Sequence, residues 1–516
     1  MVKRGIVSSS HELASFWGAK CLQDGGNVVD AAITTSEVLS VVQNNMCGLG
    51  GDMFALVKVG NRVTELNSSG RAAGTASIDF YEKRGLLEIP QRGALGAITV
   101  PGMVRGWGDL HERFCTLELV NLLQPAIGYA ENGFPITEKY SASISDSVST
   151  IGKFDGWREI FLPQGIVPPA GFNLKQKDLA KSLEAISLHG VDEFYYGGLS
   201  ELISKGIAAQ GGIISKDDLQ NHKSNWIENP ISTEYRGVKI YETSPNSQAA
   251  TVLLWLNMLE QFEISDMELD SQEFARIVVE TCIKAYAERA KHISDPKYFP
   301  LPPNFITKKY AQEVLSNDDS GPVLKEKKSH IPDGDTTYFA IGDSEGNCVS
   351  VIQSNYMGFG SGLVPRGTGI VLHDRGCYFS LDRNHHNALV PNKRTFHTLC
   401  ASVGEKDGET LFAIGSMGGD VQPQIHVQLM TQILDFGVDL QRAIDRPRWI
   451  IPTTIYEDPK ELCTETSTFS FTPENLAIVP LGGFSSKCGH AQAIYRTEEG
   501  LFGAADPRGD GASVGF

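Results

Sequence analysis

Apolar and polar positions change their period several times along the chain, and each change predicts a different kind of element. Small and apolar residues recur at helical spacing from Ser10 to Val42, with a break at Gly25 and Gly26, which predicts two consecutive helices. Alternating residues around a Gly-Asn turn predict a β-hairpin within residues 52–72. Residues 104–292 follow a mostly helical pattern, and residues 293–335, interrupted by six prolines, are expected to be irregular.

After Thr336 the pattern becomes mainly extended. Residues 336–355 predict two strands joined by a tight turn, and residues 491–507 predict a second hairpin. Residues 409–436 predict a strand, a glycine-rich turn and an amphipathic helix. A turn-rich run ending at Asp335 passes directly into two threonines, so the sequence indicates a boundary that places a hydroxyl at the start of a buried strand.

The composition is that of an ordinary soluble globular protein of 516 residues, with 41% hydrophobic and 21% charged residues. The formal net charge of −17 argues against a nucleic-acid partner, because phosphate binding requires a basic face. No apolar run is long enough to span a bilayer, and the first residues lack the apolar segment of a secretory signal, so we expect no membrane association. Nine cysteines without a CxxC motif favour reduced, buried thiols and a cytoplasmic location.

Short motifs narrow the possible chemistry. The pattern G-x-S-x-G occurs at 342–346 and 511–515, but the first is a hairpin turn and no helix follows the second, so neither predicts a hydrolase nucleophile. The twelve histidines lack the spacing of metal ligands, and we predict no metal site. Residues 47–54 are expected to be a tight backbone packing site. Residues 415–422 occupy a strand-to-helix turn, whose backbone N–H groups could stabilise an oxyanion.

Several motifs in a fixed order resemble the γ-glutamyltranspeptidase family of N-terminal nucleophile hydrolases over nearly the whole chain. They include "CGLGGDMF", "SSGRAAGTAS", "VPGMVRGW", "GDTTYFAIGDSEGNCVSVIQS", "PNKRTFH", "GSMGGD" and "GAADPRGDG". The resemblance implies an α+β fold, a four-layer αββα sandwich. It also implies cleavage of the Asp335–Thr336 bond, which would give a large segment (1–335) and a small segment (336–516) that remain together in one intertwined body.

The resemblance further implies which residues carry the chemistry. Thr336 would be the nucleophile, and its freed α-amino group, which titrates near 7.7–8.0 in proteins, would be the base. Gly418 and Gly419 would donate backbone N–H groups to the oxyanion. Ser354 falls at the family's supporting hydroxyl, and Thr337 follows the nucleophile. Since nucleophile, base and oxyanion donors all come from the chain, no cofactor is implied.

The substrate-binding positions depart from the family pattern. The resemblance assigns carboxylate binding to Arg71, while the family's three ammonium-binding positions fall on Tyr356, Arg375 and Tyr378. Two serines that usually help to hold the carboxylate are replaced here, by His397 and Thr398. A carboxylate is therefore lost and a guanidinium is gained. Two unit cations 4 Å apart repel by about 4 kcal/mol at an effective dielectric near 20, so this change affects which substrates fit.

These features predict an autoprocessing threonine amidohydrolase for γ-glutamyl amides such as glutathione, with an anionic acyl group anchored by Arg71 and Arg375. A lid segment at 380–394, shorter than the family's, favours water over an amine as acceptor. Two alternatives are an acylase for glutaryl-type amides that lack the α-ammonium, and an uncleaved, inactive relative that serves as a binding protein. The expected partners are a small-molecule amide, water or an amine, and a further copy of the chain in a homo-oligomer.

Overall fold

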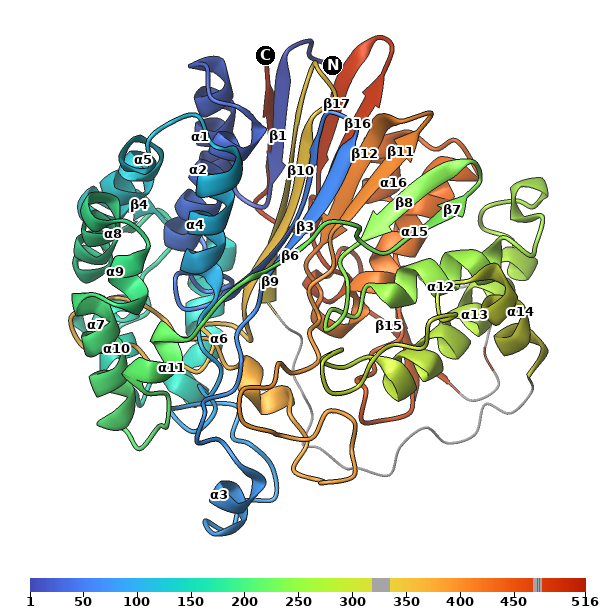
Figure 1. Ribbon diagram of the computed structural model, residues 1–516. Helices are drawn as coiled ribbons and strands as arrows, with labels where there is room; N and C mark the ends of the chain where they lie inside the picture. The colour runs from blue at the N-terminus through green and yellow to red at the C-terminus, as the bar shows by residue number, and fades with distance from the viewer. Residues whose placement is uncertain (318–334, 467–470, 472, 474–475) are drawn as a thin grey trace.

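The computed structural model describes residues 1–317, 335–466, 471, 473 and 476–516. Two β-sheets lie face to face in the middle, and a layer of helices covers the outer side of each sheet (Figure 1). This is the four-layer αββα arrangement that the resemblance implied, and the α+β fold is confirmed. Residues 318–334, part of the segment predicted to be irregular, lie outside the described residues.

The first sheet has the order β18-β1-β9-β10-β2-β3-β6. Its strands are β18 (Ala512–Gly515), β1 (Gly5–Ser9), β9 (Asp335–Asp343), β10 (Cys348–Tyr356), β2 (Asp52–Val59), β3 (Arg62–Ser68) and β6 (Asn225–Ile227). The second sheet has the order β17-β16-β12-β11-β8-β7. Its strands are β17 (Gly500–Ala505), β16 (Ala491–Thr497), β12 (Glu409–Ser416), β11 (Ser402–Lys406), β8 (Val238–Glu242) and β7 (Ser232–Tyr235).

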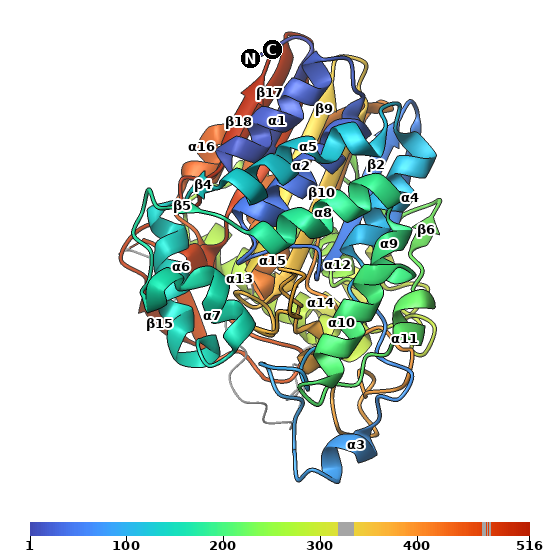
Figure 2. The ribbon, with the colours of Figure 1, turned by 90° about the vertical axis from the view of Figure 1, so that its left-hand side faces the viewer.

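Each helical layer comes from separate stretches of the chain (Figures 1 and 2). The first contains α1 (Glu12–Gln23), α2 (Val28–Val42), α4 (Met103–Phe114), α5 (Leu119–Asn132), α6 (Glu138–Ile151), α7 (Asp155–Phe161), α8 (Lys177–His189), α9 (Asp192–Tyr195), α10 (Gly198–Ala208) and α11 (Lys216–Gln220). The second contains α12 (Ala250–Leu259), α13 (Gln272–His292), α14 (Lys308–Ser316), α15 (Gln422–Leu434) and α16 (Leu440–Asp445). The short helix α3 (Ile78–Glu82) projects away from the layers.

Each central sheet contains strands from both sides of the Asp335–Thr336 bond. In the first sheet, β9 pairs with β1 on one side and with β10 on the other, and β10 pairs with β2. In the second sheet, β11 lies between β12 and β8. The two ends of the chain also meet, because β1 pairs with β18 (Figure 2). Neither segment therefore contains a complete copy of either central sheet.

Most predicted elements are present, the region 104–292 is mostly helical as predicted, and one prediction is partly wrong. The hairpins β2–β3, β9–β10 and β16–β17, the consecutive helices α1 and α2, and the strand–turn–helix of β12 and α15 are confirmed. The region predicted to be mostly helical also contains the hairpin β7–β8. Its turn uses Arg236 and Gly237, both with positive φ, and arginine gives no sequence signal for such a turn. The irregular region contains α14, which is capped by the Thr307 hydroxyl.

A compact apolar layer joins the two sheets and fixes which side chains face the interior between them. It includes Leu56 of β2 and Tyr338 and Ala340 of β9, which lie against Val403 of β11 and Ala413 of β12. Successive residues of a strand point to opposite faces, so residue 336 shares the face of Tyr338 and Ala340. The first threonine of the pair therefore points between the sheets.

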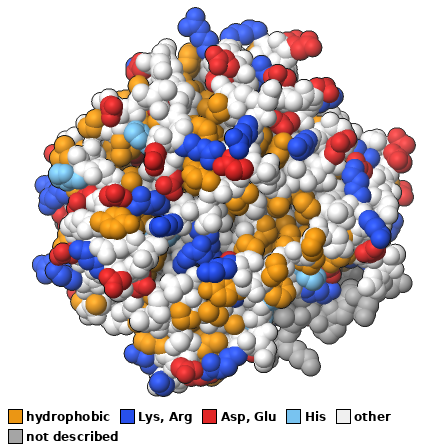
Figure 3. All heavy atoms as spheres, viewed as in Figure 1, with side chains coloured by type: hydrophobic (Ala, Val, Ile, Leu, Met, Phe, Trp, Pro, Cys, Tyr) orange, Lys and Arg blue, Asp and Glu red, His pale blue; other side chains and the backbone are white. Residues whose placement is uncertain are grey.

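The surface carries charges of both signs. On the face drawn in Figure 3, Lys and Arg side chains are interspersed with Asp and Glu side chains. None of the described helices is long and apolar enough to cross a membrane.

Candidate active site

The two threonines at the start of β9 point in opposite directions. Thr336 is 1% exposed and faces the second sheet, where Tyr338 packs so closely on Gly415 of β12 that a Cβ there would lie 2.2 Å from its ring. Thr337 faces the first helical layer, next to Cys47 and its register partner Gln353. Of the two hydroxyls, that of Thr336 thus shares the inter-sheet space with the end of β12.

A single hydroxyl connects Thr336 with the peptide bond that precedes it. Thr336 Oγ1 donates to Ser354 Oγ at 3.1 Å, and Ser354 Oγ donates to the carbonyl oxygen of Asp335 at 2.6 Å. The N–H of Tyr356 donates to the same Ser354 oxygen at 2.7 Å, which fixes its orientation. Ser354 therefore contacts both the predicted nucleophile and the carbonyl group that this nucleophile would attack during cleavage.

The predicted oxyanion donors form the turn between β12 and α15. Gly418 has φ 138° and Gly419 has φ 55°, conformations that favour glycine. The carbonyl of Gly419 accepts from Gln248 Nε2 at 2.9 Å, which fixes the peptide plane. Within the described part of the chain, neither glycine N–H has a protein acceptor. Both donors lie at the positive end of α15 and can bind an anion.

A buried network of ion pairs and hydrogen bonds stabilises this turn. Arg289 of α13 donates to Gln248 Oε1 at 2.6 Å, to the Asp420 carbonyl at 3.1 Å and to its carboxylate at 3.2 Å. The Tyr378 hydroxyl donates to the same carboxylate oxygen. Burial raises the pKa of Asp420, and Arg289 and Tyr378 oppose that rise. The network ties α13 to the residue that follows the glycine pair.

Tyr356, Arg375 and Tyr378, predicted at the ammonium-binding positions, lie together. The Arg375 guanidinium stacks on the Tyr356 ring, 3.9 Å from its centroid, and the two tyrosine rings are 5.8 Å apart. Tyr356 is the register partner of Asp335, so this group borders the Asp335–Thr336 bond. A substrate ammonium bound here would lie next to a cation and two tyrosine rings. The Tyr378 hydroxyl would not bind it, because this hydroxyl donates to the Asp420 carboxylate.

His397 and Thr398 do not present a carboxylate-binding pair. His397 Nε2 lies 3.1 Å from Asp52 Oδ2, and His373 Nδ1 lies 3.7 Å from the same atom. Burial, and then the charge of Arg375, lowers the pKa of His397 to about 3, so the imidazole is neutral. The Thr398 hydroxyl is buried and has no partner among the described residues. Asp52 on β2 and Ser354 on β10 are register partners in neighbouring strands. The contact between His397 and Asp52 therefore lies next to the residue that binds the Thr336 hydroxyl.

Arg71 lies at the edge of the site and already has protein partners. Its side chain is 28% exposed and forms an ion pair with Asp295 at 3.7 Å, and it donates to Asn225 Oδ1 at 3.4 Å. Arg394 is buried beside it and donates to the same Asn225 oxygen at 2.9 Å and to the Ser69 carbonyl at 2.9 Å. Burial, and then the charge of Arg71, lowers the pKa of Arg394 to about 9.

The structure thus brings together most of the predicted site residues and adds others. Thr337 is the exception, because it faces the helices. Sequence reasoning missed five residues that support the site, namely Asp52, Gln248, Arg289, Arg394 and Asp420. Three of them lie inside quoted motifs, since Asp52 belongs to "CGLGGDMF", Arg394 belongs to "PNKRTFH" and Asp420 ends "GSMGGD". Within the described residues, no group of three His, Cys, Asp or Glu could hold a metal ion, and no disulfide is formed.

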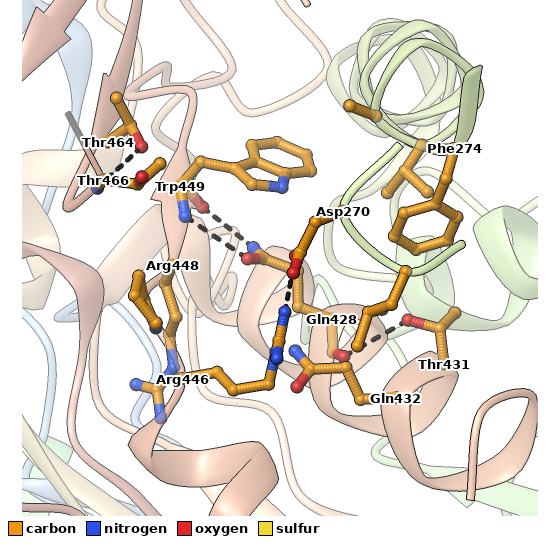
Figure 4. A pocket seen from close by; sticks show the side chains of 14 residues that line it. Asp270, Phe274, Gln428, Thr431, Gln432, Arg446, Arg448, Trp449, Thr464 and Thr466 are labelled. Atoms are coloured by element: carbon orange, nitrogen blue, oxygen red, sulfur yellow. Dashed lines mark hydrogen bonds and ion pairs between the residues drawn. The ribbon is translucent and has the colours of Figure 1, made fainter. Parts of the chain in front are cut away.

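A cavity of about 340 Å³ lies elsewhere in the second helical layer (Figure 4). Phe274 of α13, Gln428 and Gln432 of α15, and Trp449 of β13 (Trp449–Ile450) line it. Gln432 is ten residues from the start of α15, about 15 Å along the helix axis from the glycine turn. None of the residues that line the cavity belongs to the site around Thr336.

Comparison with known proteins agrees with this geometry. The family profile described as Gamma-glutamyltranspeptidase matches residues 14–516. The Glutathione hydrolase-like YwrD proenzyme of Bacillus subtilis is 38% identical over 99% of this chain and 98% of its own length. The Oxamate amidohydrolase proenzyme of Klebsiella pneumoniae is 34% identical over 99% of this chain and 98% of its own.

Among solved structures, the cephalosporin acylase from Bacillus halodurans superimposes with a TM-score of 0.90 at 34% identity, covering 100% of this chain and 96% of that one. The match extends over both sheets and both helical layers, and the profile includes the glycine pair and Thr336. The chain belongs to the gamma-glutamyltranspeptidase family of N-terminal nucleophile hydrolases.

Proposed function

We propose that the protein is an autoprocessing amidohydrolase in which Thr336 cleaves γ-glutamyl amides through an acyl-enzyme, with water as the main acceptor. The observation that carries the proposal is the contact of Ser354 with both the Thr336 hydroxyl and the Asp335 carbonyl. This arrangement aligns an internal nucleophile with the peptide bond at the predicted boundary of the large and small segments.

Maturation requires only groups of the chain and one water molecule. Thr336 Oγ1 attacks the Asp335 carbonyl carbon, and its proton passes through Ser354 to the amide nitrogen of Thr336. The Asp335–Thr336 C–N bond then breaks, and the former amide nitrogen becomes the α-amine of Thr336. Water hydrolyses the resulting ester, which releases the Asp335 carboxylate and restores the Thr336 hydroxyl.

The matured site would use the same nucleophile on a substrate. The free α-amine, with a pKa near 7.7–8.0, accepts the proton of Thr336 Oγ1 as this oxygen attacks the amide carbon. The N–H groups of Gly418 and Gly419 stabilise the oxyanion, and one such donor typically contributes ~2.7–4 kcal/mol of barrier lowering. The amine leaves with the proton, and water then cleaves the acyl-enzyme ester.

A second candidate function is an acylase for glutaryl-type amides, and the group around Arg375 favours it. A cation and two tyrosines occupy the positions expected to bind the α-ammonium, so an acyl group without an ammonium avoids the repulsion. The relatives named as an oxamate amidohydrolase and a cephalosporin acylase support this alternative, since neither name specifies a γ-glutamyl amide.

The first test is the intact mass of the protein under denaturing conditions, for wild type and for Thr336→Ala. We expect two fragments in the wild type, ending at Asp335 and beginning at Thr336, and a single full-length species in the variant. A single full-length wild type without amidase activity would contradict the proposal and favour the uncleaved binding relative.

The second test compares the two candidate substrates on the matured enzyme. Values of kcat/KM are measured for γ-glutamyl p-nitroanilide and for glutaryl p-nitroanilide, with and without an added amine acceptor. A higher value for the γ-glutamyl compound supports the first function, and a strong preference for the glutaryl compound supports the acylase. The cytoplasmic location and a homo-oligomeric state stay predictions.

A further inference from the structure

Arg375 differs from the other buried arginines in how its guanidinium is used. Four others, Arg289, Arg394, Arg448 and Arg508, each donate from Nη1 to a protein oxygen. Arg375 is 2% exposed, yet neither of its Nη atoms has a hydrogen-bond partner among the described residues. A buried, unpaired charged donor is costly, so this group is suited to receive an anion.

Three nearby carboxylates interact with the charge of Arg375 at longer range, but each forms its ion pair with another residue. Asp52 contacts His397 at 3.1 Å, Asp374 lies 4.0 Å from Arg92, and Asp420 lies 3.2 Å from Arg289. Within the described residues, no carboxylate oxygen lies within 4.0 Å of a nitrogen of Arg375. Its two terminal nitrogens remain available for the two oxygens of one external carboxylate.

The surroundings of Arg375 place such a carboxylate next to the reacting bond. Arg375 begins a single helical turn, η3 (Arg375–Tyr378), and stacks on Tyr356. Tyr356 has φ 77°, a strained value for a non-glycine residue, and lies opposite Asp335. Asp420 on the other side follows Gly419, and its pKa responds to the charge of Arg375. The guanidinium thus lies between the nucleophile strand and the oxyanion turn.

Arg71 is less suited to be the main anchor of an acyl carboxylate. It is partly exposed, forms an ion pair with Asp295 and donates to Asn225. A carboxylate bound by Arg71 would compete with Asp295, and the neighbouring water would weaken the attraction. A carboxylate bound by Arg375 would displace no hydrogen bond of its two terminal nitrogens among the described residues.

We propose that Arg375 is the residue that binds the free carboxylate of the acyl donor, with Arg71 as an accessory cation at the rim. The substrates are then amides of a dicarboxylic acid whose second carboxylate is free. This inference rests on the proposed amidohydrolase activity of Thr336. It holds for γ-glutamyl and glutaryl donors alike, because both present a carboxylate at the same distance from the amide.

The experiment uses glutaryl p-nitroanilide and the same anilide with its free carboxylate converted to a carboxamide. We expect the wild type to prefer the acid, and Arg375→Gln to lower kcat/KM for the acid about 10- to 100-fold while leaving that for the carboxamide nearly unchanged. Arg375→Lys keeps the positive charge but cannot bind both carboxylate oxygens with a planar pair of N–H groups. Its kcat/KM for the acid should lie between those of the wild type and Arg375→Gln. Arg62→Gln, which removes an exposed arginine paired with Glu228 at the start of β3, is the matched control and should match the wild type.

A binding measurement separates this inference from the proposed function. Free glutarate should raise the melting temperature of the wild type, of Arg62→Gln and of the inactive Thr336→Ala, but not of Arg375→Gln. If Arg375→Gln does not fold, Arg375→Lys is used in its place, and its kcat/KM is expected to fall for the acid anilide but not for the carboxamide anilide. Equal losses on both anilides, or no loss, overturn the inference even where the wild type is cleaved and active. An uncleaved, inactive wild type overturns the proposed function instead.

Discussion

Ser354 offers one oxygen to three neighbours, and the effect of removing it follows from those contacts. Its hydroxyl orients Thr336 and donates to the Asp335 carbonyl, whose polarisation assists the attack. We expect Ser354→Ala to slow the appearance of the two fragments about 10- to 100-fold, the usual contribution of one positioned proton-transfer or donor group. The measurement is a time course of intact mass after synthesis.

Ser354→Thr is the control for that prediction, because it keeps the hydroxyl on a β-branched side chain suited to a strand. It should mature at a rate close to that of the wild type. Maturation of Ser354→Ala at the wild-type rate would show that the 2.6 Å contact with Asp335 has no role in cleavage.

Arg289 joins helix α13 to the turn that precedes α15. We expect its contacts to contribute more to the free energy of unfolding than those of Arg375. Arg289 is fully buried and bonds to Gln248, Asp420 and Thr453. Removing one partner of a buried ion pair leaves an uncompensated charge, so we expect Arg289→Met to lower the free energy of unfolding by about 3–5 kcal/mol.

Arg375→Met is the matched comparison, since it removes a buried guanidinium without terminal hydrogen bonds. We expect its free energy of unfolding to equal or exceed that of the wild type. Urea denaturation of both variants, prepared on the Thr336→Ala background so that cleavage does not differ, makes the comparison. A larger loss for Arg375→Met than for Arg289→Met would mean that Arg375 has structural partners.

The contact between the two sheets should depend on pH through Glu65. This β3 residue accepts hydrogen bonds from the backbone and hydroxyl of Ser244, which follows β8 of the other sheet. Burial, opposed by these bonds, raises the pKa of Glu65 to about 7. The folded state therefore holds a proton more tightly than the unfolded chain. This contribution to stability is present below about pH 4.5 and is lost as pH rises through about 7.

Glu65→Gln removes that titration while keeping an amide that can bond to Ser244. We expect the free energy of unfolding of the wild type, relative to Glu65→Gln, to decrease by about 3 kcal/mol between pH 4.5 and pH 8. Chemical denaturation of both proteins at several pH values measures the difference. A difference that is the same at every pH would contradict the raised pKa.

The elements that could be predicted from the chain are those whose signal is local. In the strand–turn–helix of β12 and α15, apolar residues recur with a period of two, then Gly418 and Gly419 follow, and then apolar residues recur with a period of 3.6. All three signals fall within 28 residues. The hairpin β7–β8 and helix α14 lacked such signals, since the first turns at Arg236 and the second is short and bordered by prolines. Local preference could not identify either one.

Motif order along the sequence was enough to indicate the family, Thr336 and the glycine pair, because backbone chemistry at a strand start and at a helix start is encoded within a few residues. Only the tertiary structure determined which side chains keep free hydrogen-bonding groups. Arg71 and Arg375 look alike in the sequence, but Asp295 and Asn225, both distant in the chain, engage the first and leave the second unpaired. Such pairings depend on how sheets and helices pack together, and no short segment specifies them.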